Sequence, residues 1–214
     1  MEAIESHTAL PLVPLPRSFF ERPTLTVARE LLGHLLVRQL GKDLLLGRIV
    51  ETEAYIGEGD PACHAARGKT PRNAIMYGPP GYAYIYFIYG MYYCLNVVTE
   101  SEGFPAAVLI RALEPLEGIA TMQHLRGQKK LTQLTSGPGK LCQALQLTRK
   151  ENGLDLCESG KLFIARGHPV PDEEVVVDGR IGIKEGNEHP WRFFIKNNPH
   201  VSYPKQVLPA KTQC

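Results

Sequence analysis

Residues 85–96 read IYFIYGMYYCLN, and they form the centre of a run of strand-forming residues that extends over 82–98. β-Branched and aromatic residues favour strands, so the run predicts sheet throughout. It is interrupted at Tyr89-Gly90, where the glycine permits a tight turn. We therefore expect two strands joined at a turn, with Tyr89, Met91 and Tyr92 pushed outwards at its tip. Exposed apolar tips of this kind serve as wedges between stacked base pairs.

Tyrosines are concentrated around this turn, because seven of the nine in the chain lie between positions 77 and 93. Side chains alternate between the two faces of a strand. Tyr82, Tyr84 and Tyr86 should therefore share one face, while Ile85 and Phe87 pack on the other. Ordinary half-buried packing explains such an aromatic face as well as a binding surface for flat rings does.

The segments on either side predict an α+β fold with an antiparallel core, because strands and helices follow in mixed order rather than as repeated βαβ units. No internal repeat or linker divides the chain. We expect one domain over residues 16–214, preceded by a proline-rich mobile tail over residues 1–15. Hydrophobic periodicity predicts helices at 25–33, 115–126 and about 137–146, and sheet at 34–40, 44–57, 106–115, 162–167, 175–184 and 192–197.

Composition indicates a soluble, intracellular globular protein. The chain has 214 residues, of which 43% are hydrophobic and 21% charged. It contains no apolar run of the roughly 20 residues that a membrane helix needs, and its acidic, proline-broken start is unlike a signal peptide. The five cysteines are odd in number and widely spaced, which disfavours both a disulfide framework and a structural zinc site. Cys94 and Cys142 lie in apolar patterns and are expected in the core.

The net charge is only +2, but acidic residues are absent from two long segments, 61–99 and 121–150. The second segment holds six basic residues. One positive face, suited to a polyanion, and a solvated surface without carboxylates are both consistent with this pattern.

Three groups of residues are candidates for chemistry. Glu51 and Glu53 lie two apart near the end of a predicted strand, hence on one face, where a carboxylate can act as a base toward water. Spacing does not choose between them. Tyr55 and His64 flank the turn that follows. Arg111 lies inside an apolar strand and either pairs with a glutamate or faces solvent.

Five motifs, in this order, resemble the alkyladenine (3-methyladenine) DNA glycosylase family of the animal type. They are GRIVETEAYIG, TPRN, YIYFIYGMYYCLN, LIRALEPLEG and SGPGKLCQAL, and the resemblance covers roughly residues 16–205. It implies a compact α+β domain with a curved, mainly antiparallel sheet, flanking helices and a protruding β-hairpin that enters the DNA minor groove. It also implies a monofunctional base-excision-repair enzyme that acts as a monomer without metal or cofactor, in the nucleus of a eukaryote or the cytoplasm and nucleoid of a bacterium.

The resemblance implies a role for each matching position. Glu53, rather than Glu51, matches the general base, and Arg111 and the carbonyl of Ile181 match groups that hold the attacking water. The positions that match contacts to the extruded base are Tyr55, Ala62, His64, Tyr86 and Asn96. The positions that match DNA contacts are Tyr89, which fills the gap left by the flipped nucleotide, Met91, Tyr92, and the phosphate-binding residues Arg72, Lys140 and Arg149.

This assignment explains the tyrosines. A base must leave the stack before its glycosidic bond can be hydrolysed, and aromatic rings then hold the flipped purine. Alkylated purines such as 3-methyladenine and 7-methylguanine are cationic and attract ring faces, whereas hypoxanthine and ethenoadenine need edge contacts. We expect duplex DNA with a damaged purine as the partner and an abasic site as the product.

Two other functions fit part of the pattern. A non-catalytic module that binds damaged nucleic acid would keep the rings but would not require Glu53 or Arg111. An N-glycosidase for free nucleosides would keep the carboxylate but would have no use for the Tyr89 turn.

Overall fold

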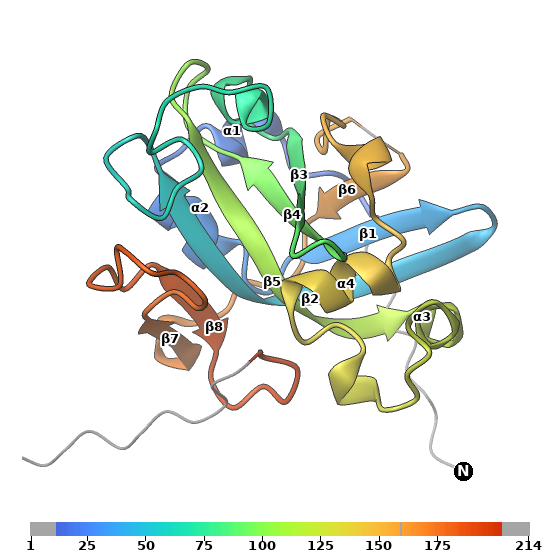
Figure 1. The fold of residues 1–214 in the computed structure, drawn as a ribbon. Helices are drawn as coiled ribbons and strands as arrows, with labels where there is room; N and C mark the ends of the chain where they lie inside the picture. The colour runs from blue at the N-terminus through green and yellow to red at the C-terminus, as the bar shows by residue number, and fades with distance from the viewer. Residues whose placement is uncertain (1–11, 159, 203–214) are drawn as a thin grey trace, which may run out of the picture.

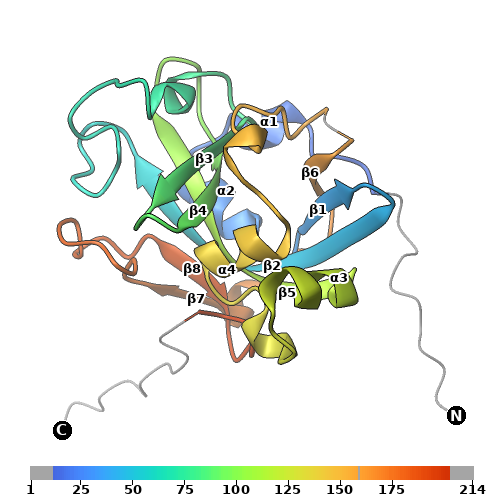
Figure 2. The same ribbon diagram turned by 45° about the vertical axis from the view of Figure 1, so that its right-hand side comes forward.

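One sheet of eight strands runs through the computed structural model, which describes residues 12–158 and 160–202. The order along the sheet is β3-β4-β5-β2-β1-β6, and β8 pairs with both β2 and β7. Every pairing is antiparallel. The strands are β1 Leu35–Leu40, β2 Asp43–Ile56, β3 Ala83–Ile88, β4 Tyr92–Val98, β5 Ala106–Glu117, β6 Leu162–Ala165, β7 Val175–Asp178 and β8 Arg192–Ile195. Figures 1 and 2 show the long strands β2 and β5 crossing the whole curled sheet.

Short helices lie against this sheet. They are α1 Arg17–Phe20, α2 Thr24–Glu30, α3 Ile119–Arg126 and α4 Pro138–Ala144, with 3₁₀ turns at Ala74–Tyr77, Leu131–Gln133, Arg149–Glu151 and Asp172–Glu174. α2 packs on β2, β5 and β8, whereas α4 packs on β4 and β5. The α+β class with a curved antiparallel sheet is confirmed. No helix in the described part of the chain is long and apolar enough to cross a membrane.

The hairpin β3–β4 forms where residues 82–98 predicted it. The two strands pair in register from Ala83 with Val97 to Ile88 with Tyr92, and the loop between them begins at Tyr89-Gly90. Ile85 belongs to the main core, while Tyr82, Tyr84 and Tyr86 pack in a second, smaller cluster. The tyrosine face is separate from the core, as predicted, but Phe87 does not join Ile85 in the core; it is half-buried and meets the ring of Tyr93 at 5.0 Å. Cys94 and Cys142 are buried, as expected.

Two predicted elements differ from the structure. The helix predicted at 115–126 begins at Ile119, because residues up to Glu117 extend β5 and pair with β2. Gly118 separates the two with φ 71°, and a Cβ there would lie 2.4 Å from Leu45 Cδ2. The strand predicted at 175–184 ends at Asp178, and residues 179–184 form a loop instead. Its alternating isoleucines resemble a strand, but its backbone turns at Gly182, where φ is 77°.

The chain already packs against the sheet at residues 14 and 15. Pro14 pairs with Ala165, and the buried Leu15 donates its amide hydrogen to Ile164 O at 2.7 Å. Residues 1–11 of the predicted tail, and residues 203–214, lie outside the described residues.

His34 is buried in the bend between α2 and β1, and it titrates in the acidic range. Its Nδ1 accepts a hydrogen bond from Gly167 N at 2.9 Å, and the ring meets Phe19 edge to face. Burial, supported by the positive charge of Arg166, lowers the pKa of His34 from 6.5 to about 4. The folded protein therefore holds this ring neutral at a pH where the unfolded chain protonates it.

This histidine makes the free energy of unfolding depend on pH. Its contribution is fully present above pH 6.5 and is lost as the pH falls toward 4, by up to about 3 kcal/mol. His34→Asn keeps an acceptor for the Gly167 amide but does not titrate. We expect chemical denaturation of this variant to show a flatter decline between pH 6.5 and 4 than the parent does; parallel curves would contradict the account.

Candidate active site

Two carboxylates and one arginine meet in the interior of the sheet, where β2 and β5 pair irregularly. The register shifts on both sides of Glu51, so neither Val50 nor Arg111 has a regular partner across the two strands. Such bulges turn side chains away from the regular alternation and are frequent beside active sites. Glu51, Glu53 and Arg111 all have buried side chains. The prediction that both glutamates share one face is confirmed, because both contact Arg111.

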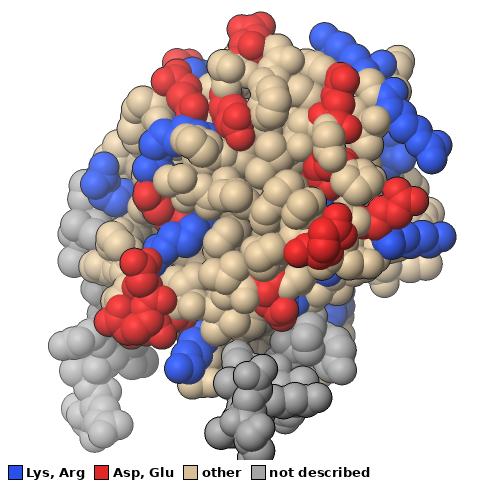
Figure 3. Space-filling view, turned by 90° about the vertical axis from the view of Figure 1, so that its left-hand side faces the viewer, with Lys and Arg blue, Asp and Glu red and all other residues tan. Residues whose placement is uncertain are grey.

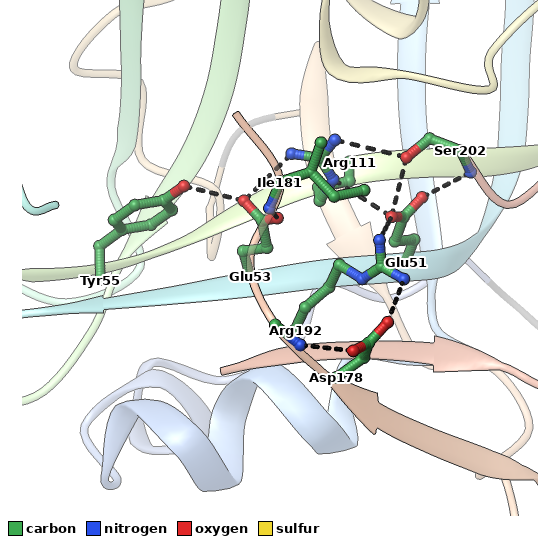
Figure 4. A network of polar contacts seen from close by, with 9 residues as sticks. Glu51, Glu53, Tyr55, Arg111, Asp178, Ile181, Arg192 and Ser202 are labelled. Atoms are coloured by element: carbon green, nitrogen blue, oxygen red, sulfur yellow. Dashed lines mark hydrogen bonds and ion pairs between the residues drawn. The ribbon is translucent and has the colours of Figure 1, made fainter. Parts of the chain in front are cut away.

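Glu53 is held by three donors (Figure 4). Ile181 N donates to Oε1 at 2.7 Å, while Tyr55 Oη and Arg111 Nη1 donate to Oε2 at 2.8 and 3.0 Å. Burial, together with the charge of Glu53, raises the pKa of Tyr55 well above its ordinary value, so the phenol remains a donor. A carboxylate has about four acceptor sites, which leaves capacity on Oε1 for a water molecule beside the three donors.

Glu51 holds Arg111 from the other side. It accepts hydrogen bonds from Arg111 Nε at 3.2 Å, from Ser202 N at 2.7 Å and from Ser202 Oγ at 2.8 Å. Burial alone would lower the pKa of Arg111. The charges of Glu53 and Glu51 more than offset this, so the pKa of Arg111 is raised above its ordinary value. The guanidinium is therefore a permanent cation between two carboxylates.

A second buried arginine extends the network. Arg192 on β8 lies 3.7 Å from Glu51 and donates to Asp178 Oδ2 at 3.1 Å (Figure 4). Burial lowers the pKa of Arg192, and the charges of Glu51 and Asp178 offset this only in part. Arg192 therefore depends on both carboxylates to remain charged in the interior.

A cavity of about 760 Å³ opens beside this network. Arg111, Tyr55 and Ile181 form part of its wall, so the groups that hold Glu53 also face the cavity. The other predicted site residues in the wall are Ala62, His64, Tyr86, Asn96, Tyr89, Tyr92 and Lys140. Figure 4 shows Tyr55 and Ile181 pointing toward Glu53 from different parts of the chain.

Aromatic rings line one side of the cavity. His64 and Tyr86 meet with ring centroids 4.4 Å apart at 74°. His64 Nδ1 also lies 2.7 Å from Tyr84 Oη, and Asn96 Nδ2 donates to Tyr84 O at 2.9 Å. Burial of the imidazole, with the nearby charge of Arg72, lowers the pKa of His64 to about 4. The residue as a whole is exposed, but its ring is enclosed between Tyr84 and Tyr86, and His64 is therefore neutral at pH 7.

The hairpin tip is exposed and strained. The side chains of Tyr89 and Met91 are 75% and 62% exposed. Tyr89 adopts φ 53°, a left-handed conformation that costs a bulky residue about 1–2 kcal/mol. Tyr92, predicted to point outwards with them, is half-buried and packs on α4. A Cβ on Gly139 would lie 2.9 Å from Tyr92 Cδ1, so this close packing requires glycine.

The three residues predicted to contact phosphates lie in different surroundings. Lys140 lies in the cavity wall and contacts Ser136 Oγ at 3.5 Å, whereas Arg149 is exposed on a 3₁₀ turn. Arg72 is exposed, with Cζ 5.5 Å from the ring centroid of Tyr86. Figure 3, which faces the side of β7, β8 and the loop after β2, shows acidic and basic side chains interspersed. That face carries both charges, and a positive face elsewhere stays a prediction.

Five residues of the site were not identified from the sequence, namely Asp60, Asp178, Arg180, Arg192 and Ser202. Asp60 follows the ETEAY motif in a turn and resembled an ordinary turn residue. Arg180 and Asp178 lie in the segment that was predicted as sheet. Ser202 reaches Glu51 from the far end of the chain, and no local pattern signals it. The described residues contain no cluster of three or more His, Cys, Asp or Glu side chains that could hold a metal ion.

Residues 18–199 match the family described as "Methylpurine-DNA glycosylase (MPG)". The chain belongs to the methylpurine-DNA glycosylase family. A protein of Methanocella arvoryzae named "Putative 3-methyladenine DNA glycosylase" is 56% identical over 192 residues, which cover 88% of this chain and 95% of that protein. Proteins with the same name from Carboxydothermus hydrogenoformans and Myxococcus xanthus are 55% and 50% identical, covering 88% of this chain and 98% and 93% of their own lengths.

Membership of the methylpurine-DNA glycosylase family makes the chain an enzyme of DNA repair, a DNA glycosylase. It confirms the resemblance drawn from the five motifs and the class of enzyme expected from them. The individual roles of the site residues remain predictions.

In this glycosylase, removal of the Glu51 charge should destabilise the fold. Glu51→Gln would leave Arg111 with Glu53 as its single counter-charge and Arg192 with only the half-exposed Asp178, and we expect the free energy of unfolding to fall by about 3 kcal/mol. Urea denaturation measures it, with Glu173→Gln, which alters an exposed carboxylate, as the matched control. Equal losses in both variants would contradict the account.

Tyr89→Asn should raise stability, because asparagine tolerates the left-handed conformation and the exposed ring contributes little burial. We expect a gain of about 0.5–1 kcal/mol in thermal or urea denaturation. Val177→Asn, at an exposed strand position of ordinary conformation, is the control and should not gain. A clear loss in Tyr89→Asn would show that the ring stabilises the hairpin.

Proposed function

We propose that this glycosylase removes alkylated and deaminated purines from duplex DNA by hydrolysis, with Glu53 as the base that activates water. The observation that carries the proposal is the position of Glu53. Its carboxylate lies directly behind the wall of a ring-lined cavity, and Arg111, Tyr55 and Ile181 of that wall hold it.

Hydrolysis requires a water molecule aligned with C1′ of the damaged nucleotide. Glu53 Oε1 accepts its proton as the water attacks, and the carboxylate offsets the positive charge that develops on the sugar. Arg111 and the carbonyl of Ile181 orient the same water. The glycosidic electron pair leaves with the base, which needs no second acid when an alkylated purine is already cationic.

The base occupies the cavity between Tyr55 on one side and His64 and Tyr86 on the other. Stacking contributes about 1–3 kcal/mol per base, and cationic purines gain further attraction to the ring faces. Neutral His64 and the backbone at Ala62 read the base edge, while Asn96 disfavours the exocyclic amine of normal guanine. The proposed substrates are 3-methyladenine, 7-methylguanine, hypoxanthine and ethenoadenine.

The hairpin tip keeps the DNA open. Tyr89 fills the gap that the flipped nucleotide leaves, and Met91 lies beside it in the minor groove, while Tyr92 packs on α4 at the base of the tip. The strain at Tyr89 supports this role, because a residue selected for stability alone would be glycine or asparagine. Arg72, Lys140 and Arg149 contact phosphates, and the enzyme acts as a monomer on double-stranded DNA.

The test is excision from a duplex that contains one hypoxanthine or one 7-methylguanine, with EDTA present. We expect the parent to release the base and leave an intact abasic strand, without a covalent adduct that borohydride could trap. Glu53→Gln should lose activity at least about a hundredfold while still binding the duplex. Glu114→Gln is the control, because Glu114 contacts Arg48 and Asn198 outside the cavity.

Different results would separate the alternatives. Binding of the damaged duplex without release of either base would leave only a binding function. Equal activity on free nucleosides, or full activity of Glu53→Gln, would overturn the proposed substrate or the proposed base respectively.

A further inference from the structure

A buried ion pair lies directly behind the base-binding wall. Arg180 Nη1 and Nη2 donate to Asp60 Oδ2 and Oδ1 at 2.6 and 2.8 Å, and both side chains are fully buried. Asp60 also accepts from the amides of Ile56 and Ala62, while Arg180 donates to the carbonyl of Ala54. The pair therefore joins the turn after β2 to the loop after β7.

Arg180 is stacked between two rings. Its Cζ lies 4.8 Å from the ring centroid of Tyr55 and 4.9 Å from that of Trp191. Tyr55 lines the cavity, whereas Arg180 and Asp60 are not in the cavity wall. The Arg180 guanidinium thus lies behind the Tyr55 ring, and Asp60 pairs with both of its terminal nitrogens.

The charge behind the ring acts on a charge in front of it. A purine stacked on Tyr55 would lie within about 8–9 Å of Arg180, a distance at which unit charges still interact inside a protein. Arg180 alone would repel a cationic purine and compete with it for the electrons of the ring. Asp60 cancels that repulsion, because the bidentate pair is neutral as a whole.

The neighbouring charges determine how sensitive the wall is to this balance. In the described network, the carboxylates are Glu51, Glu53, Asp60 and Asp178, and the guanidiniums are Arg111, Arg180 and Arg192. Asp178 is exposed, so the buried part of the network has three carboxylates and three guanidiniums, and their charges balance. Loss of the Asp60 charge would leave the buried site with a net positive charge and loss of the Arg180 charge would leave it with a net negative charge, with little water to screen either.

We propose that the Asp60–Arg180 pair sets the preference between cationic and neutral purines by balancing the charge behind Tyr55. The inference rests on the proposed function and deepens it. Both members act through the Tyr55 ring and are positioning residues; neither takes part in the chemistry.

Variants that neutralise one or both members of the pair test the charge balance. We would measure kcat/KM for 7-methylguanine and for hypoxanthine in the same duplex, and take their ratio. Asp60→Asn leaves Arg180 uncompensated, so the ratio should fall about three- to tenfold; Arg180→Gln leaves Asp60 uncompensated, so it should rise by a similar factor. The double variant is neutral again, and its ratio should return to within about twofold of the parent.

The opposite directions of the two ratio changes distinguish an effect of charge from a loss of structure in the two loops. Loosening of the two loops would lower both rates together, would move both single variants in one direction, and would not be rescued in the double variant. Asp172→Asn, which removes an exposed carboxylate paired with Arg29, is the matched control and should leave the ratio unchanged.

Failure of the inference differs from failure of the proposed function. A parent that releases both bases, with ratios unmoved in both single variants, overturns the inference alone. A parent that releases hypoxanthine only also overturns it, because a balanced wall has no charge with which to reject the cation. If the parent releases 7-methylguanine only, the test is its kcat/KM for that base. Asp60→Asn should lower this value and the double variant should restore it; no recovery in the double variant overturns the inference. A parent that releases neither base overturns the proposed function, and the inference with it.

Discussion

The burial of Arg111 between Glu51 and Glu53 is the constraint on which the rest of the site depends. A guanidinium in the interior of a sheet is tolerated only if its charge and its N–H groups are satisfied there. Two carboxylates on one strand satisfy it, and the irregular register of β2 and β5 directs the three side chains to a common point. Each carboxylate then has acceptor capacity left over. Glu51 uses it to bind Ser202, and Glu53 to bind Ile181 and Tyr55.

This arrangement ties remote parts of the chain to one point. Ser202, at the end of the described residues, bonds to Glu51. The loop after β7 places Ile181 against Glu53 and Arg180 against Asp60. The loop has few regular backbone pairings of its own, because its polar groups bond to the site instead. Its conformation is therefore determined by buried charges rather than by propensity, and the cavity wall is only as rigid as those contacts.

The difference between conformations determined by local propensity and those determined by distant buried contacts explains what the sequence could predict. Local periodicity located the β3–β4 hairpin, separated Ile85 from the tyrosine face, and placed Glu51 and Glu53 on one side of β2. It did not distinguish the two glutamates, because their difference lies in partners more than a hundred residues away along the chain. Alternation also misassigned residues 179–184, where Ile181 and Ile183 repeat every second position without pairing. Family motifs named Glu53, but they did not include Asp60, Arg180 or Ser202, which support the site from behind.

The hairpin tip and the cavity wall each contain an unfavourable free-energy term, but they differ in what offsets it. At Tyr89 the backbone is strained and the ring is exposed, so the cost is local, and under the proposed function it would be recovered when DNA covers the ring. Behind Tyr55 the cost is the desolvation of Asp60 and Arg180, and it is offset within the protein by bidentate contact. Arg72 near Tyr86 provides the contrast, because it is exposed and water screens its charge. Of the two arginines that lie over these rings of the cavity wall, only Arg180 is buried in a medium of low dielectric constant. Under the proposed function, its counter-ion would therefore set how the wall responds to the charge of a base, whereas the rings would stack on any flat ligand.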